Sequence, residues 1–240
     1  MIRVTDLTVR FGGVTAIDHL SVEFPDGTCG LVGPNGAGKS TFFNAISGFV
    51  RPQSGRVELN GEDLLALPDF RRVRRGVRRT FQQEQSIAEL SVFDNVLLSY
   101  EHSGRIGHRR QRDNIMDALA FTGLDAVAWR RVGGLPARER RLTEIARAIA
   151  GRPAAVLLDE PAAGLPEPES RHIGQIIRRI PAELGAQVAL VDHDMDLVSS
   201  SCTNLVVIDF GRLVAAGDTP SVLKDERVLA AYIGTEDSVA

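Results

Sequence analysis

The residues best suited to chemistry stand in one short run, Gly33-Pro34-Asn35-Gly36-Ala37-Gly38-Lys39-Ser40. This spacing of glycine, lysine and serine is typical of a loop whose backbone N–H groups surround phosphate oxygens. The glycines allow the main chain to approach the ligand closely. The ammonium group of Lys39 can reach the β- and γ-phosphates, and the hydroxyl of Ser40 can contact Mg²⁺. The run therefore predicts binding of a nucleoside triphosphate; the simpler alternative is a glycine-rich turn before a helix.

The choice of lysine within this run supports the same interpretation. The chain has 28 basic residues, of which only Lys39 and Lys224 are lysines. A compact ammonium fits among phosphate oxygens, whereas a guanidinium is bulkier and demands fork geometry. A chain that uses arginine elsewhere thus keeps lysine where phosphate chemistry favours it.

A second chemical signal is the pair Asp159 and Glu160, which follows the apolar run 155–158. Open α/β sheets bind ligands at the carboxyl ends of their strands, which is where this pair is expected to lie. We expect Asp159 to hold Mg²⁺, directly or through water, and Glu160 to polarise the attacking water. An apolar strand ending in two acids means little alone, but it gains weight in a chain that also has a phosphate loop.

These residues require a strand-rich core to position them. Alternating or continuous apolar residues predict strands, and apolar residues at helical spacing predict helices. Strands are expected at 2–10, 20–24, 29–32, 55–59, 154–158, 187–191, 205–208 and 212–216. Helices are expected at 40–47, 92–100, 112–121 and 140–150. A helical segment is thus inserted into a core built from the two ends of the chain.

Composition is that of a soluble globular protein, with 43% hydrophobic and 25% charged residues. A net charge of −3 gives no general attraction for nucleic acid. Cys29 and Cys202 lie in apolar contexts, which predicts two buried thiols rather than a disulfide or a metal pair. No signal peptide and no apolar run of membrane-spanning length is visible. We therefore expect another chain to span any membrane involved.

A dense basic stretch precedes the middle of the chain. Its members are Arg71, Arg72, Arg74, Arg75, Arg78 and Arg79. The simpler interpretation is a solvated helix face and strand edge. The alternative is contact with phosphate, a partner chain or lipid headgroups.

The chain resembles the ATP-binding cassette (ABC) ATPases over essentially its full length. The resemblance rests on segments 33–41, 80–82, 157–165 and 191–195. It implies an α/β fold of the P-loop NTPase type, an ABC-type nucleotide-binding domain with an antiparallel β subdomain and a helical subdomain. It places the RecA-like core and β subdomain at about 1–67 and 154–240, and the helical subdomain, with the Q-loop and an altered signature, at about 68–150.

The resemblance also implies a role for each site residue, with ATP and Mg²⁺ as the ligands. Gln82 would reach Mg²⁺ and the attacking water, its neighbour Gln83 being the weaker candidate. His193 would contact the γ-phosphate, and Phe11 would stack on adenine. The implied catalytic residues are Glu160, His193 and Gln82. The implied Mg²⁺ ligands are Ser40, Gln82 and Asp159. The implied ATP contacts are Phe11, Asn35, Gly36, Gly38, Lys39, Ser40 and Thr41.

Within this family the chain is similar to the ATPases of high-affinity branched-chain amino-acid importers. Segments 11–13, 79–82, 159–165, 193–195 and 231–234 carry this similarity. It implies an ATP-hydrolysing subunit at the cytoplasmic face of the cell membrane. Its partners would be permease subunits and a second ABC ATPase subunit, a heterodimer being favoured over a homodimer, and indirectly a solute-binding protein. Coupling to the permeases is expected through the region after Gln82, including Phe93 and Val96.

Two alternative functions stay open. One is the same ATPase in the export of lipid or lipopolysaccharide. The other is a soluble ABC protein of DNA repair or translation. Proteins of that second kind usually carry paired cassettes or a long coiled-coil insert, and this sequence shows neither.

The chain departs from the family pattern at the signature motif, which is usually Leu-Ser-Gly-Gly-Gln and caps the γ-phosphate bound to the other subunit. The register places it at Leu135-Pro136-Ala137-Arg138-Glu139, just before the helix expected at 140–150. Pro136 offers neither a hydroxyl nor an N–H group, and Arg138 adds bulk and charge. Pro166 stands in the D-loop where the family usually has Asp or Asn. These changes predict an intact ATP-binding half and a degraded capping half, unless Arg138 itself contacts the phosphate.

Overall fold

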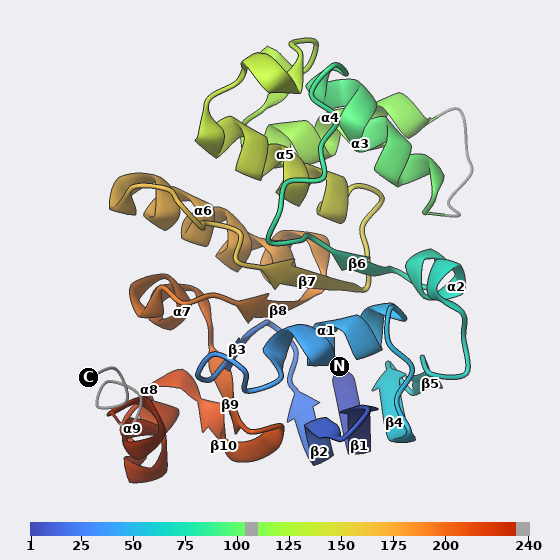
Figure 1. The fold of residues 1–240 in the computed structure, drawn as a ribbon. Coiled ribbons are helices and arrows are strands. Elements are labelled where there is room, and N and C mark those ends of the chain that lie inside the picture. The colour runs from blue at the N-terminus through green and yellow to red at the C-terminus, as the bar shows by residue number, and fades with distance from the viewer. Residues whose placement is uncertain (104–109, 234–240) are drawn as a thin grey trace. The chain divides into compact units, whose positions relative to one another are not determined.

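The computed structural model describes residues 1–103 and 110–233 (Figure 1). They form two compact units. The first unit combines Met1–Asp69 with Ala189–Ala240, and the second is Phe70–Val188. Each unit brings together segments that are distant in the sequence, and each has its own buried apolar residues.

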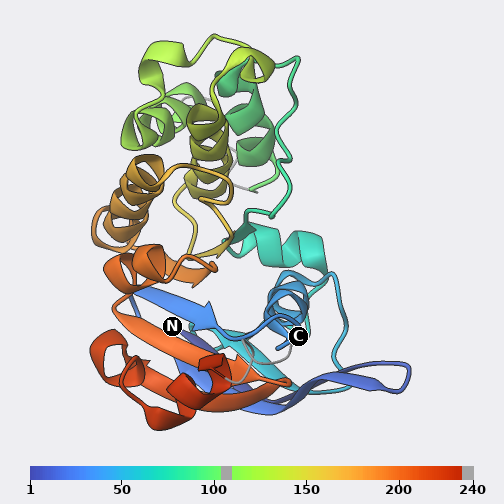
Figure 2. The same cartoon turned by 60° about the vertical axis from the view of Figure 1, so that its left-hand side comes forward.

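An antiparallel sheet of the first unit has the strand order β2-β1-β4-β5. Its strands are β1 (Ile2–Phe11), β2 (Val14–Phe24), β4 (Ser54–Leu59) and β5 (Glu62–Asp63). Figure 2 shows β1 and β2 as a long hairpin, paired from Ile2 opposite Phe24 to Phe11 opposite Val14. The second strand is longer than the predicted 20–24, because its first half pairs with β1 without an alternating apolar pattern of its own.

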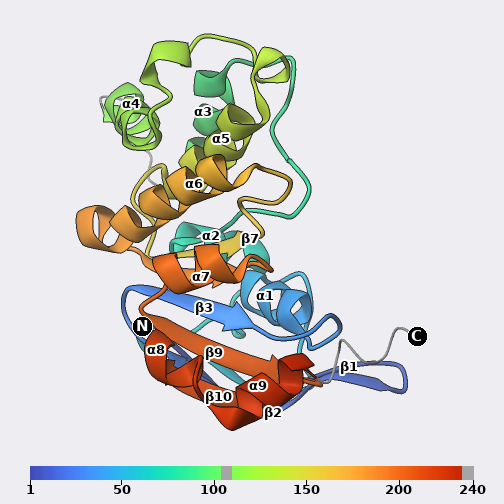
Figure 3. The ribbon, with the colours of Figure 1, turned by 90° about the vertical axis from the view of Figure 1, so that its left-hand side faces the viewer.

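The other strands of the first unit follow the order β10-β9-β3-β8. They are β3 (Thr28–Val32), β8 (Gln187–Val191), β9 (Asn204–Asp209) and β10 (Arg212–Asp218). All five residues of β3 are buried, and β3 runs parallel to β9. The helices of this unit are α1 (Lys39–Ser47), α7 (Met195–Ser201), α8 (Thr219–Val222) and α9 (Glu226–Ile233) (Figure 3). The ring of Phe42 on α1 stacks on Phe24 of β2, with 5.3 Å between centroids.

Both cysteines are buried free thiols in this unit, as the sequence predicts. Burial raises the pKa of the Cys29 thiol, and the nearby Cys202 raises it further. Burial also raises the pKa of Cys202 to about 12, with Asp192 adding to the effect. Both thiols are therefore protonated, unreactive and part of the core.

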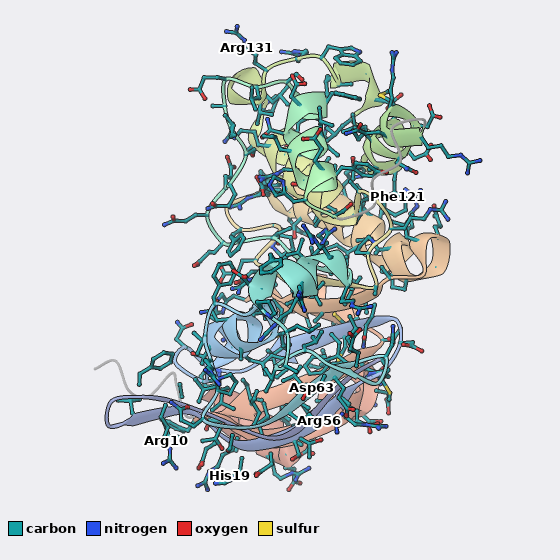
Figure 4. The ribbon with its side chains drawn as sticks, turned by 90° about the vertical axis from the view of Figure 1, so that its right-hand side faces the viewer. Arg10, His19, Arg56, Asp63, Phe121 and Arg131 are labelled. Carbon is teal, nitrogen blue, oxygen red and sulfur yellow. The ribbon has the colours of Figure 1, made fainter. Side chains whose placement is uncertain are left out.

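The second unit joins two short parallel strands to a set of helices. The strands are β6 (Val77–Arg79) and β7 (Ala155–Asp159), with Val77 opposite Ala155. The helices are α2 (Asp69–Arg74), α3 (Val92–Glu101), α4 (Gln111–Thr122), α5 (Ala137–Ile149) and α6 (Glu167–Arg179). The guanidinium of Arg179 lies 4.6 Å from the ring centre of Phe121, which Figure 4 labels on α4.

Local signals explain several helix ends. Ser91 caps α3 by accepting the Asp94 N–H, and Gly123 ends α4 in the left-handed conformation. The sequence analysis did not predict α6, whose second residue is Pro168. Proline is tolerated in the first turn of a helix, and the buried Ile173 and Ile177 supply the apolar face.

Among the residues that the structure describes, no helix is both long and apolar enough to cross a membrane.

Two glycines of the phosphate loop test how closely the first unit is packed. Gly33 has φ 155°, and a Cβ there would collide with the carbonyl oxygen of Ile208. Gly36 has φ 83°, but a Cβ there would meet nothing within 4 Å. We expect Gly36→Ala to lower the unfolding free energy by about 1 kcal/mol, from backbone strain alone. Gly33→Ala should cost about 3 kcal/mol, because β9 must also move. Urea unfolding of both variants measures the difference, and equal losses would contradict the close approach.

Candidate nucleotide site

The phosphate loop lies in the first unit, between β3 and α1. Lys39 is only 7% exposed. Its Nζ donates to the carbonyl oxygens of Gly33, at 2.5 Å, and Pro34, at 3.0 Å. The loop is thus already folded around the ammonium group that its sequence predicts to bind phosphate. Asn35 and Gly36 are exposed at the loop's tip.

The helix that follows begins without a side-chain cap. Gly38 occupies the N-cap position with φ 106°, and α1 has no side-chain cap hydrogen bond. Ser40 is exposed and Thr41 is half-buried in its first turn. The positive end of the helix dipole and its backbone N–H groups are suited to an anion at this end.

The turn between β9 and β10 holds the loop from the other side. Gly211 donates its N–H to the carbonyl of Ala37 at 2.9 Å and accepts the N–H of Asp18 at 3.0 Å. A Cβ on Gly211 would lie 2.6 Å from the carbonyl oxygen of Ala16. These contacts tie the loop to β2 and β9 and fix its conformation.

Phe11 and His193, the other site residues predicted for the first unit, are both exposed. Phe11 ends β1 and is 51% exposed, as stacking on an adenine would require. His193 follows β8 and precedes Asp194, which caps α7 by accepting the N–H groups of Asp196 and Leu197. This cap fixes the turn that carries the histidine.

The second unit holds the predicted carboxylates. All five residues of β7, ending at Asp159, are buried. Thr80, just after β6, extends the pairing of the two strands. Its N–H donates to the carbonyl of Leu157 at 2.9 Å, and its Oγ1 accepts the N–H of Asp159 at 3.2 Å. The two strand ends are therefore locked in register, which brings the segment after Thr80 beside the segment after Asp159.

Glu160 and Gln82 meet at these strand ends. The amide Nε2 of Gln82 donates to Glu160 Oε2 at 2.9 Å. Glu160 has φ 48°, in the left-handed region that non-glycine residues rarely adopt. Strained conformations of this kind cluster at functional sites. The structure thus brings Gln82 together with Glu160.

Asp159 has a partner that the sequence analysis did not assign. Arg79 Nη2 lies 2.8 Å from Asp159 Oδ2, and these side chains are only 7% and 9% exposed. The expectation that the arginine stretch is a solvated face was therefore wrong for Arg79, and also for the buried Arg72 and Arg78. No local signal marked this pair, because Arg79 is placed beside Asp159 by the pairing of β6 with β7.

The altered signature does not precede α5, as expected, but forms its beginning. Pro136 is the N-cap residue and Ala137 the first helical residue, three residues earlier than predicted. Proline suits this place because the first N–H groups of a helix have no intrahelical partner. Arg138 pairs with Glu139 at 2.9 Å, and its side chain is 41% exposed.

Two further arginines of α5 reach neighbouring loops. Arg140 donates to the carbonyl of Leu135 at 2.8 Å. Arg141 donates to the carbonyls of Gln82, at 3.0 Å, and Ala163, at 3.2 Å. Arg140 also donates to the carboxylate of Glu84 at 3.0 Å. The sequence analysis missed both arginines, because Glu84, Gln82 and Ala163 are distant from them in the sequence.

The surface expected to meet a permease needs one correction. Val96 is fully buried and cannot contact a partner directly. Phe93 is half-buried and stacks on Trp129 at 4.6 Å between ring centres. Trp129 is 62% exposed, so it offers an aromatic side chain at this surface. Residue 234, part of the similarity to importer ATPases, lies outside the described residues.

The donor set is chemically suited to magnesium. Serine hydroxyl, aspartate carboxylate and glutamine carbonyl are hard oxygen ligands, and Mg²⁺ is usually bound by few protein ligands together with substrate phosphates. The described ranges contain no cluster of three or more His, Cys, Asp or Glu that could hold a metal alone.

Comparison with known proteins gives one consistent result. The ABC transporter family profile matches residues 17–163. The chain is 33% identical to the high-affinity branched-chain amino acid transport ATP-binding protein BraF of Pseudomonas aeruginosa PAO1, with 98% of each chain covered. It is 32% identical to LivG of Escherichia coli K12, which is also a high-affinity branched-chain amino acid transport ATP-binding protein, and 98% of each chain is covered.

Solved structures agree with the fold. The ADP conformation of MJ1267, an ATP-binding cassette of an ABC transporter, superimposes with a TM-score of 0.86 at 28% identity, and 98% of each chain is covered. A nucleotide-free ATP-binding cassette from an ABC transporter gives the same TM-score at 27% identity, over 98% of this chain and 99% of the other. The fold is thus that of an ABC-type P-loop ATPase, and with its folded phosphate loop the chain belongs to the ABC transporter family as an ATP-hydrolysing cassette.

Proposed function

We propose that this chain is the ATPase subunit of an importer for branched-chain amino acids or a similar small polar solute. The observation that carries the proposal is its similarity to BraF and LivG over 98% of its length. The structure agrees with the first requirement of such a subunit, because the phosphate loop is folded and held by its neighbours. The transported solute would be chosen by the other subunits.

Nucleotide binding is assigned to the first unit. Phe11 would stack on the adenine, and its exposed ring at a strand end supports this role. Backbone N–H groups from Asn35 to Thr41, with the Lys39 ammonium, would bind the phosphates. Lys39 would exchange its two carbonyl acceptors for phosphate oxygens. His193 would contact the γ-phosphate.

Hydrolysis is assigned to Glu160 and Gln82. Glu160 would hold the attacking water by accepting a hydrogen bond, and the water oxygen would bond to the γ-phosphorus as the bond to the bridging oxygen breaks. The products are ADP and phosphate, and the water proton leaves to the phosphate or to solvent. Gln82, bonded to Glu160 at 2.9 Å, would orient that carboxylate. Catalysis of this kind is mostly positioning and electrostatics.

Magnesium would be held by Ser40, Asp159 and Gln82. When bound, Mg²⁺ neutralises charge on the β- and γ-phosphates. Asp159 is paired with Arg79 at 2.8 Å. Because a carboxylate can accept several bonds, the ion pair leaves it chemically suited to a second cation.

The proposal also includes the division of the chain into subdomains, its location in the cell and its partner subunits. The core and β subdomain would be formed by 1–67 and 154–240 and the helical subdomain by 68–150, in support of which α3, α4 and α5 all lie between residues 92 and 149. The chain would act at the cytoplasmic face of the membrane, with permeases, a solute-binding protein and a second ATPase subunit. The altered signature supports a heterodimer, in which a normal partner provides one intact capping half.

Hydrolysis of Mg-ATP tests the proposal. The chain should be slow alone and active when assembled with the second ATPase subunit and the permease subunits of its transporter. Glu160→Gln should reduce turnover by roughly 100-fold or more, because it removes the water-polarising carboxylate. Lys39→Ala should abolish tight nucleotide binding.

Uptake of labelled leucine into vesicles that contain the assembled complex tests which solute is transported. Vesicles that hydrolyse ATP but take up no branched-chain amino acid would contradict the importer assignment and leave the ATPase assignment intact.

The triple variant Pro136→Ser, Ala137→Gly, Arg138→Gly restores the usual signature. If the capping half is degraded, ATPase activity of the assembled complex should rise several-fold. The fold should survive, because the Arg138–Glu139 pair is partly exposed and worth little, and a glycine in the first turn costs about 1 kcal/mol. A fall in activity would instead assign phosphate contact to Arg138. Unchanged activity contradicts both interpretations.

Arg79→Gln tests the buried ion pair. Removing one partner leaves Asp159 buried without its cation, which should lower the unfolding free energy by about 3 kcal/mol. Mg-ADP should recover part of this loss if the cation approaches Asp159. Thermal melting with and without Mg-ADP measures both effects. Arg71→Gln, an exposed arginine of the same stretch, is the matched control; equal melting of the two variants would refute a structural role for Arg79.

A further inference from the structure

The second unit contains a cavity of about 330 Å³ at the opposite end of its two strands from the carboxylates. Gly76 and Ala154, which directly precede β6 and β7, line it. Asp159 is the last residue of the five-residue β7. At about 3.3 Å per residue, roughly 15 Å separates the cavity from Asp159. The cavity is therefore distinct from the carboxylate site.

The cavity is lined by positive charge. Among the described residues, its lining contains Arg74, Arg75, Arg78 and Arg152, and no aspartate or glutamate. Glu183 lies next to a lining residue, but its Oε1 accepts from Arg179 Nε at 2.7 Å. This bond with Arg179 lowers the pKa of the Glu183 carboxyl. Glu183 is thus committed to a pair outside the lining, and an anion in the cavity would be attracted by the guanidinium groups that line it.

Two of these arginines are held by neighbouring groups. The buried Arg78 donates through Nη1 to the main-chain carbonyls of Val73 and Val77. The guanidinium of Arg74 lies 5.7 Å from the ring centre of Phe70. An ordered guanidinium loses less conformational entropy when it binds a ligand.

The backbone brings the separate parts of the lining together. Gly76 has φ 96°, and a Cβ there would lie 2.7 Å from the backbone nitrogen of Ala154. The N–H of Gln187, the first residue of β8 and part of the second unit, donates to the carbonyl of Ala154 at 3.0 Å, which places the start of β8 at the same edge. Three chain segments thus converge at the start of β6 and β7.

Arg152 has a backbone conformation that favours glycine. Its φ is 53°, directly after Gly151 at φ 79°. An arginine in the left-handed region costs stability relative to glycine. Because the backbone conformation at this position would favour glycine, we attribute the presence of an arginine to a role of its side chain.

We propose that this cavity binds a compact phosphate-bearing anion through Arg74 and Arg152. Guanidinium groups bind phosphate oxygens in pairs of parallel hydrogen bonds. The volume is that of a small-ligand pocket and suits a group the size of pyrophosphate. A soluble phosphate ester and a lipid headgroup share this chemistry. The site is independent of the ATPase assignment, because none of the residues proposed for nucleotide binding or hydrolysis lines it.

Calorimetric titration with pyrophosphate tests the proposal. The full chain carries Lys39→Ala throughout, so that binding at the phosphate loop is weakened equally in every sample. The Arg74→Gln, Arg152→Gln double variant should bind about 100-fold more weakly, since each lost charged contact accounts for about tenfold. Arg71→Gln, on the same helix but outside the lining, should leave binding unchanged. Equal weakening by the control would overturn the site in favour of general surface charge.

Vesicles identify the source of the anion. Sedimentation with phosphatidylglycerol vesicles, lost in the double variant and absent with phosphatidylcholine alone, would assign a lipid headgroup. Pyrophosphate binding without sedimentation would assign a soluble phosphate. The absence of both overturns the proposal.

Arg152→Gly separates binding from folding. This variant should weaken pyrophosphate binding about tenfold while leaving the melting temperature unchanged or higher, because strain is relieved. A lower melting temperature with unchanged binding would show that Arg152 has a structural role only.

Discussion

The phosphate loop can follow its path only where side chains are absent. At Gly33, Gly38 and Gly211 a Cβ would run into a backbone carbonyl of β2 or β9. This close approach holds the carbonyl groups of Gly33 and Pro34 around the Lys39 ammonium. A preorganised loop need not be reordered when an anion arrives, so more of the interaction energy becomes binding energy. The rest of the first unit, from the β1–β2 hairpin to the β9–β10 turn, provides the backbone against which this loop is packed.

A different constraint governs the second unit, where a carboxylate is buried at a strand end. Burying a charge is costly unless it is paired. Arg79 supplies the opposite charge, and Thr80 fixes the register that brings the two strand ends together. The next residue after Asp159, Glu160, lies in the left-handed region, where it meets Gln82. The strained glutamate thus directly follows the residue whose burial the ion pair stabilises.

Much of this arrangement could be predicted from the sequence, because it depends on local patterns. The phosphate loop, β3, β7 and β8 are marked by glycine spacing and continuous apolar runs, and the structure confirms all of them. The partner of Asp159 could not be predicted, because Arg79 looks like any other member of a basic stretch until strand pairing places it. The start of α5 at Ala137, three residues before the predicted 140, could not be read from an apolar pattern, because Pro136 serves as the N-cap residue, a position that does not need an N–H group. Non-local pairing and helix-end geometry account for these differences.

The arginines of α5 explain why the altered signature need not disconnect this helix from its surroundings. Arg141 donates to backbone carbonyls on two different loops, those of Gln82 and Ala163. A planar guanidinium with several fixed donors can bridge two acceptors in this way, whereas an ammonium acts as a single point charge. Pro136 and Arg138 take no part in this bridge. Their side chains therefore change which groups the start of α5 presents to a ligand, but they leave the hydrogen bonds of Arg141 intact. Arg141 thus keeps α5 hydrogen-bonded to the loops beside the carboxylates, whereas Pro136 and Arg138 determine how the start of the helix could contact a phosphate. The two roles of this helix belong to different residues.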